Sequence, residues 1–102
     1  MAYNVKSVNG VTIRLPDERW LHITEEHAEM GIYLHETLMA IEKPLAIFEG
    51  AEGELLAARE IETGKYIVVA YREVSVEDGF VITAFLTRRW KQIERRKKLW
   101  SQ

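Results

Sequence analysis

The sequence predicts an α+β fold: an N-terminal hairpin and two helices packed on a four-stranded antiparallel sheet, with a basic C-terminal helix. Three observations lead to this prediction. They are an Asn9-Gly10 pair near the N-terminus, helical periodicity between residues 17 and 43, and four β-like runs separated by glycines between residues 45 and 86. Because 102 residues is the size of one domain, we expect residues 1–102 to form a single domain.

The first expected element is a β-hairpin. Residues 3–8 and 11–15 flank the Asn9-Gly10 pair, which is a strong signal for a tight turn between two strands. Pro16 then ends the second strand, and Asp17 is suited to cap the helix that follows.

An amphipathic helix is expected to run from that cap to Gly31, which breaks it. On a helical wheel His27 falls in the middle of the apolar arc, whereas His22 falls on the opposite, acidic side. A second helix is expected from Leu34 onward, and Lys43-Pro44 ends it.

Four β-like runs follow, at residues 45–48, 55–61, 65–74 and 80–86. The last two are expected to pair as a long hairpin across residues 75–78. If Val74 lies opposite Gly79, one face of that hairpin is apolar and packs on the helices. In that register Arg72 and Thr83 are diagonal neighbours on the other, more open face. From Arg88 onward the spacing of apolar residues indicates a further helix.

Composition excludes several classes of protein. The chain contains no cysteine, so disulfides, thiolate metal sites and cysteine nucleophiles are excluded. No apolar run approaches the roughly 18 residues that a membrane span needs, and the N-terminus lacks the pattern of a secretory signal. We therefore expect a cytoplasmic protein with no membrane partner.

The net charge of −2 conceals an asymmetry along the chain. Residues 88–102 carry seven Lys or Arg and one acidic residue, whereas residues 1–87 carry seven Lys or Arg and fifteen acidic residues. The basic segment has two interpretations, a solvated helix face or a surface that binds a polyanion. Its candidate nucleic-acid contacts are Arg88, Arg89, Lys91, Arg95 and Arg96.

Two histidines are candidates for proton transfer. His27 is either a packed boundary residue or a general acid or base that reaches a cleft at the edge of the sheet. His22 is either an ordinary surface residue among acidic neighbours or a second member of that site. The two point about 140° apart on a helix, so the spacing does not indicate a metal site, and no cofactor is expected.

Three residues near the last hairpin are candidates for binding a phosphate. Arg72 either forms a cross-strand ion pair or presents its guanidinium fork to a phosphate. Thr83 and Thr87 either reflect ordinary strand propensity or orient a phosphate through a hydroxyl group.

Three segments together resemble small prokaryotic and phage-associated domains of the barnase–EndoU–colicin–RelE-like nuclease fold. They are Leu15-Pro16-Asp17-Glu18-Arg19-Trp20 leading into His22-Ile23 and His27-Ala28-Glu29, then Tyr71-Arg72-Glu73, then residues 78–88. The resemblance implies a helical N-terminal part and a four-stranded antiparallel sheet. It also implies a metal-independent ribonuclease, often a toxin that a partner antitoxin neutralises.

Carried onto this sequence, the resemblance implies catalytic roles for His22, His27, Arg72, and Thr83 or Thr87. The expected activity is cleavage of RNA through attack by the 2′-hydroxyl on its own phosphate. The alternative is a non-enzymatic module on the same scaffold that binds a protein or a nucleic acid. A hydrolase with a carboxylate pair is disfavoured, because the acidic residues fall mostly on outward helix faces.

Overall fold

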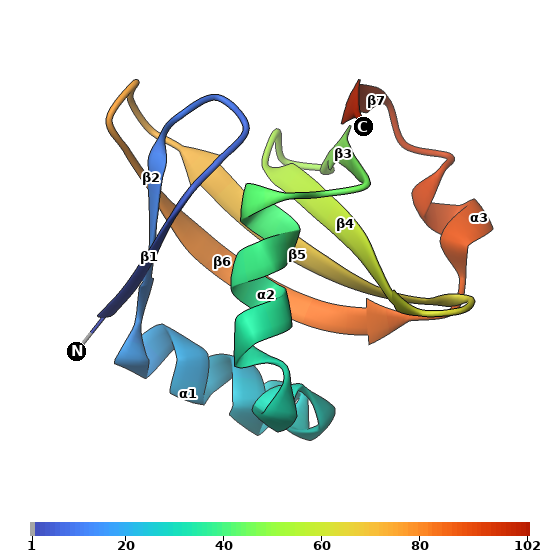
Figure 1. Ribbon diagram of the computed structural model, residues 1–102, viewed down its shortest axis with the longest axis horizontal. Helices are drawn as coiled ribbons and strands as arrows, with labels where there is room; N and C mark the ends of the chain where they lie inside the picture. Colours follow the sequence, from blue (N-terminus) through green and yellow to red (C-terminus); the bar gives the residue numbers. More distant parts are fainter. Residues whose placement is uncertain (1) are drawn as a thin grey trace.

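The computed structural model describes residues 2–102, in which seven strands form one mixed sheet (Figure 1). The strands lie side by side in the order β1-β2-β6-β5-β4-β3-β7. In chain order they are β1 (Ala2–Lys6), β2 (Thr12–Pro16), β3 (Ala46–Glu49), β4 (Leu55–Glu62), β5 (Lys65–Glu73), β6 (Asp78–Thr87) and β7 (Lys98–Ser101). The helical segments are α1 (Asp17–Glu26), the 3₁₀ helix η1 (Ala28–Ile32), α2 (Leu34–Glu42) and α3 (Trp90–Ile93).

The prediction of a four-stranded antiparallel sheet with two packed helices is wrong, because both ends of the chain add strands to that sheet. The N-terminal hairpin joins through β2, which pairs in parallel with the start of β6, residues 12–14 beside residues 78–80. Arg14 and Asp78 form an ion pair across this junction, with Nε 2.8 Å from Oδ1. At the other edge β7 pairs antiparallel with β3. Each addition supplies partners for backbone groups that would otherwise lie at an open edge.

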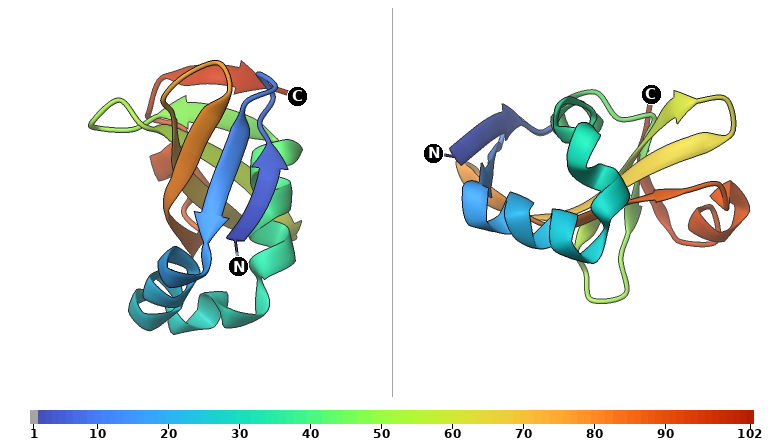
Figure 2. Two further views of the ribbon diagram at one scale, coloured as in Figure 1. Left: turned by 90° about the vertical axis from the view of Figure 1, so that its left-hand side faces the viewer. Right: turned by 90° about the horizontal axis from the view of Figure 1, so that it is seen from below.

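The N-terminal hairpin itself is confirmed. β1 and β2 pair antiparallel with Val5 opposite Ile13. The turn places Gly10 at a φ of +78°, a backbone conformation that side chains disfavour and glycine adopts freely. The left view of Figure 2 shows the hairpin lying beside β6.

In the half of the β5–β6 hairpin far from its turn, the strands pair in the predicted register. Near the turn the pairing is shifted by one residue. Ile67 lies opposite Leu86 and Ala70 opposite Thr83, but Tyr71 lies opposite Val81. Ile82 is therefore an extra residue in β6, a β-bulge. The bulge turns Val81 rather than Ile82 toward the helices, where Val81 is buried.

Two apolar cores lie on opposite faces of the sheet. The larger one joins α1 and α2 to the sheet face that carries Ile67, Val69 and Tyr71. The smaller one lies on the other face, around Phe48 and Val68, and α3 covers part of it. Figures 1 and 2 show α1 and α3 at opposite ends of the molecule.

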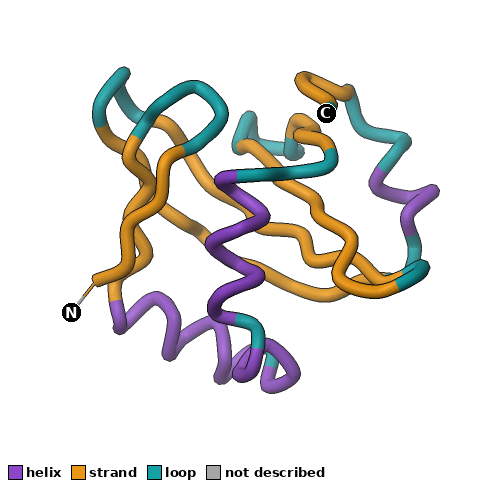
Figure 3. Tube along the Cα trace, viewed as in Figure 1, coloured by secondary structure: helices purple, strands orange, loops and turns teal. Residues whose placement is uncertain are grey.

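The first helix is shorter than predicted. α1 starts at Asp17, which is therefore its first residue rather than its cap, and ends at Glu26. His27 follows with φ −132° and ψ 79°, outside the helical region, and η1 begins at Ala28. Figure 3 shows α1, η1 and α2 as consecutive helical segments joined by very short loops. Because the helix stops before His27, the wheel position predicted for that residue does not apply.

The predicted basic C-terminal helix is also wrong. Only the four residues of α3 are helical, and the chain then turns and continues as β7. Trp90 anchors α3, because its ring stacks on Tyr66 at 4.3 Å between centroids and meets Phe48 edge-on at 5.7 Å. Tertiary packing of Trp90 and pairing of β7 with β3 thus override the local helical pattern.

Among residues 2–102, no helix has both the length and the apolar character needed to cross a membrane.

Candidate functional site

The candidate site lies at the end of β6, beyond the part of that strand that pairs with β2. β2 accompanies β6 only along residues 78–80, so the later part of β6 has no strand on that side among the residues described. α1 and η1 contact β6 instead. As a result His27, the single residue between α1 and η1, lies beside Phe85 near the end of β6.

His27 occupies this junction. Its imidazole lies 6.3 Å from the Phe85 ring, measured between centroids, and its Nδ1 lies 3.8 Å from Oε2 of Glu29. The side chain of His27 remains 38% exposed. Of the two interpretations of His27, a packed boundary residue or a group that reaches the edge of the sheet, the structure has it packed beside Phe85 and still partly open to solvent.

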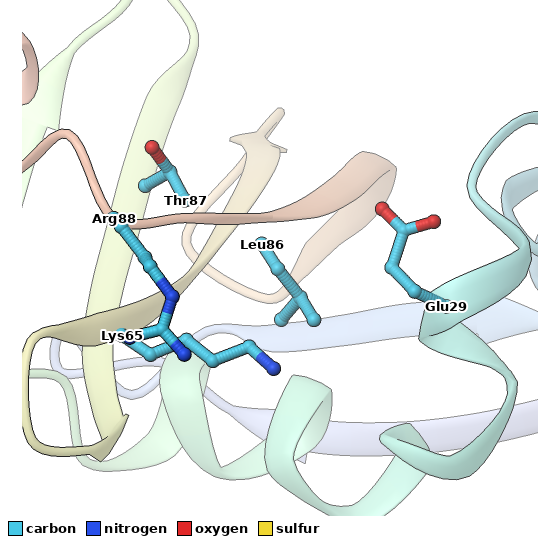
Figure 4. Close-up of a pocket in the computed structure, with 5 residues that line it drawn as sticks. All are labelled: Glu29, Lys65, Leu86, Thr87 and Arg88. Carbon is cyan, nitrogen blue, oxygen red and sulfur yellow. The ribbon is translucent and has the colours of Figure 1, made fainter.

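An open depression of about 240 Å³ adjoins this pair (Figure 4). Glu29 borders it from η1, and Lys65, Leu86 and Arg88 border it from the open end of the β5–β6 hairpin. In Figure 4 the side chains of Lys65 and Arg88 run side by side, with Leu86 between them and Glu29. One carboxylate thus faces two cations across an apolar floor.

Both cations are held by neighbours. Nη2 of Arg88 lies 3.1 Å from Oε1 of Glu62, an exposed ion pair that contributes little to stability. Nζ of Lys65 lies 5.7 Å from the centroid of the Tyr33 ring, a cation–π contact. Both cations line the depression and remain in reach of solvent.

Thr87 also lines the depression, but its hydroxyl group has another role. Its Oγ1 accepts a hydrogen bond of 3.0 Å from the backbone N–H of Arg89. Figure 4 shows the hydroxyl directed away from Lys65 and Arg88. Thr87 therefore fixes the turn that presents Arg88.

Arg72 and Thr83 lie elsewhere on the sheet. Thr87 is opposite Tyr66, and Arg72 lies six positions further along β5, which at about 3.3 Å per residue separates the two ends by about 20 Å. Nη2 of Arg72 donates a hydrogen bond of 2.9 Å to the backbone carbonyl of Glu52. Thr83, opposite Ala70, is on the same face as Arg72. A single phosphate cannot contact both Arg72 and Arg88.

A second charged cluster surrounds Glu54 at the Arg72 end. Backbone hydrogen bonds from Glu54 and Glu52 lower the pKa of the Glu54 carboxyl, and the nearby guanidinium groups of Arg72 and Arg96 add to the effect. Arg72 and Arg96 therefore face a carboxylate that is already charged at neutral pH.

His22 lies outside both clusters. It is exposed on α1, with Nε2 3.3 Å from Oε1 of Glu26, one helical turn further along. With Glu18 and Arg19 it lines a separate depression of about 390 Å³ at the start of α1. The structure does not bring His22 together with His27.

The predicted nucleic-acid contacts divide along the C-terminal segment. Arg88 and Arg89 follow β6 and Lys91 lies on α3; of the three, Arg88 lines the depression. Arg95 and Arg96 are exposed and follow α3 toward β7. Residues 88–98 thus form an extended segment, interrupted by the short helix α3, and its basic residues do not share one helix face.

Sequence reasoning missed Glu29 and Lys65. The predicted register of the hairpin pairs residue 66 with residue 87, as the structure does. The same register places Lys65 opposite Arg88, so Lys65 could have been identified from the sequence. The approach of Glu29 depends on how η1 packs on β6 and has no local signal.

Within residues 2–102, no three His, Cys, Asp or Glu side chains come together as potential metal ligands. No family model, curated protein or solved structure matches this chain.

Proposed function

We propose that this protein is an endoribonuclease that works without a metal ion and cleaves RNA at the depression beside η1. The observation that supports the proposal best is that Glu29, which lies beside His27, lines the same depression as Lys65 and Arg88. A proton-transfer group next to paired cations is what cleavage by an RNA 2′-hydroxyl requires.

In this reaction the RNA supplies its own nucleophile. The 2′-oxygen loses its proton and bonds to the adjacent phosphorus, and the bond from phosphorus to the 5′-oxygen of the next nucleotide breaks. The leaving oxygen takes up a proton, so the products are a 2′,3′-cyclic phosphate and a free 5′-hydroxyl. No water is consumed in this step.

Each side chain then has a defined task. His27 takes the proton from the 2′-oxygen and returns one to the leaving oxygen, and the Glu29 carboxylate, 3.8 Å from Nδ1, attracts the imidazole when it is protonated. Arg88 presents a planar fork to the phosphate oxygens, and Lys65 adds a second positive charge as the negative charge develops. Arg89 and Lys91 attract the flanking backbone of the RNA.

The direct experiment incubates the purified protein with a 5′-labelled single-stranded RNA in EDTA. We expect cleavage with 2′,3′-cyclic phosphate ends, and no cleavage of the matching all-deoxy strand, because it lacks the nucleophile. His27→Ala is expected to reduce the rate by about 100-fold or more, whereas His35→Ala on α2 serves as the matched histidine control.

Two outcomes contradict the proposal. An uncut RNA that nonetheless binds the protein identifies a nucleic-acid-binding module without catalysis. If His27→Ala and the unmodified protein are both folded by circular dichroism and cleave RNA at equal rates, His27 is not catalytic and cleavage does not take place at the depression.

A further inference from the structure

β7 forms the edge of the sheet opposite to β1, and its outer side is open. β7 pairs with β3 on its inner side, and no strand covers its outer side among residues 2–102. All four of its residues are exposed. On either side of a bulge at Leu99, the outward backbone groups of β7 are open to pairing with a further strand.

Apolar side chains accompany this edge. Leu99 and Trp100 of β7 are 43% and 37% exposed, and Leu45, just before β3, is 37% exposed. Trp100 lies opposite Ile47, and the backbone N–H of Gln102 donates to the carbonyl of Leu45, so these groups belong to one end of the sheet.

The same edge is strongly basic. Arg95, Arg96, Lys97 and Lys98 precede or begin β7, and all four are exposed. Nζ of Lys98 lies 5.9 Å from the Phe48 ring centroid, so its side chain lies over the smaller core. A partner that pairs with β7 would meet this basic run, in which Arg96 also lies near the Glu54 carboxylate.

We propose that β7 is the docking edge for an acidic segment of a separate polypeptide, which adds to the sheet as a further strand. The backbone of β7 supplies the hydrogen bonds, Leu99 and Trp100 contact apolar residues of the partner, and the four cations select acidic side chains. The three features lie within one short stretch and point to the same partner chemistry.

A second copy of this chain fits the edge poorly. Pairing β7 with β7 would bring two basic runs together, and like charges placed opposite one another are unfavourable. The other open edge, β1, has the sequence Ala-Tyr-Asn-Val-Lys and carries no acidic residue. Charge therefore favours a different, acidic partner over self-association.

RNA also fits this edge less well than a peptide does. Phosphates would use the cations, but they would leave the backbone donors and acceptors of β7 without partners. β7 also lies four strands away from β6, or about 19 Å at about 4.8 Å per strand. The docking edge is thus independent of the proposed ribonuclease site, and either proposal can fail alone.

The alternation of hydrogen bonds identifies the outward positions. Gln102 donates inward to Leu45, and the carbonyl of Lys97 accepts inward from Glu49. The pairing of β7 with β3 shifts between Ile47 and Phe48, so Leu99 is a bulge and the alternation of inward and outward groups is interrupted there. Counted from Gln102, Ser101, opposite Ala46, directs its N–H outward. At the other edge Ser7 donates inward to Val11, so the N–H of Asn4 points outward by the same count.

The experiment titrates the unmodified protein with a short capped peptide that alternates glutamate with valine, and follows binding by calorimetry. Ser101→Pro removes an outward donor without touching the pairing to β3, and we expect it to weaken binding by at least about fivefold, the equivalent of one backbone hydrogen bond. Asn4→Pro, which removes the equivalent donor at β1, is the matched control and is expected to bind as well as the unmodified protein.

Charge is tested with a second peptide in which lysine replaces glutamate, and with the double variant Lys97→Glu, Lys98→Glu. We expect neither the lysine peptide with the unmodified protein nor the glutamate peptide with the double variant to bind. The proposal is overturned if the glutamate peptide does not bind, or if Asn4→Pro and Ser101→Pro weaken binding equally. It is also overturned if single-stranded RNA displaces the peptide, or if the protein is a dimer by light scattering that Ser101→Pro dissociates.

Discussion

Nδ1 of His27 lies 3.8 Å from Oε2 of Glu29, across the junction between α1 and η1. The contact exists because α1 stops at Glu26 and the backbone of His27 leaves the helical region. The carboxylate stands on the Nδ1 side of the ring, so in the proposed reaction Nε2 is the nitrogen that faces the RNA. This geometry gives His27 an orienting partner.

The first prediction concerns this pair. Glu29→Gln keeps the size of the side chain but removes its negative charge, so the imidazole loses the partner that favours one orientation. We expect kcat for RNA cleavage to fall by about tenfold with little change in KM, because the lost contact acts on proton transfer rather than on binding. Single-turnover kinetics on the labelled RNA measure the change.

The control is Glu26→Gln, which removes a carboxylate next to His22 instead. Unchanged kinetics are expected for that variant. If Glu26→Gln and Glu29→Gln slow cleavage equally, the effect comes from the overall charge of the protein and not from His27.

The second prediction compares two arginines at opposite ends of the β5–β6 hairpin. We expect Arg88→Ala to lower kcat/KM for RNA by about 100-fold or more, because its fork stabilises the transition-state charge. Arg88→Lys keeps the charge and should recover only part of that loss. Arg72→Ala should have a smaller effect, since its guanidinium is bound to the carbonyl of Glu52. The reverse order would place the scissile phosphate at the Arg72 end.

The third prediction concerns the junction between β2 and β6. A Cβ atom on Gly79 would overlap the backbone oxygen of Arg72 and would lie 2.6 Å from Cδ1 of Ile13. Gly79→Ala should therefore lower the free energy of unfolding by about 1–3 kcal/mol. Gly31→Ala is the control, because its Cβ would meet no atom within 4 Å, and a change below about 0.5 kcal/mol is expected. Urea unfolding measures both; equal losses would contradict the prediction.

Local signals in the sequence predict the elements whose structure is set locally. Asn9-Gly10 marks the first turn because Gly10 adopts a positive φ there. Leu34–Glu42 and the strands β3 to β6 follow from periodicity and from the residues that separate them. The register of the β5–β6 hairpin is correct from residue 66 to residue 70, where alternating apolar residues fix it.

The remaining features depend on contacts between distant parts of the chain. No local pattern indicates that Ile13 will lie beside Gly79, or that Ile47 will lie opposite Trp100. The Ile82 bulge also has no sequence signal, because isoleucine is an ordinary strand residue. For the site, Arg88 and Thr87 were identified, but the position of His27 depended on where α1 ends, and helix ends are poorly specified by sequence.

The last prediction concerns Tyr71, which is fully buried and whose hydroxyl group has no hydrogen-bond partner among residues 2–102. Burial, with a smaller contribution from the charge of Glu73, raises the pKa of Tyr71 above its ordinary value of 10.0. The folded state thus favours the neutral phenol. Its contribution to stability is complete below pH 10 and is lost as the pH rises above that value, because the unfolded chain ionises first.

Tyr71→Phe separates these effects. At neutral pH the variant should be as stable as the unmodified protein, or more stable by about 1–3 kcal/mol, because an unsatisfied buried hydroxyl is removed. Above pH 10 its free energy of unfolding should fall less steeply. Tyr66, whose pKa is also raised, is present in both proteins and cancels in the comparison. Urea unfolding at neutral and alkaline pH measures the difference, and parallel pH profiles would show that Tyr71 ionises as readily folded as unfolded.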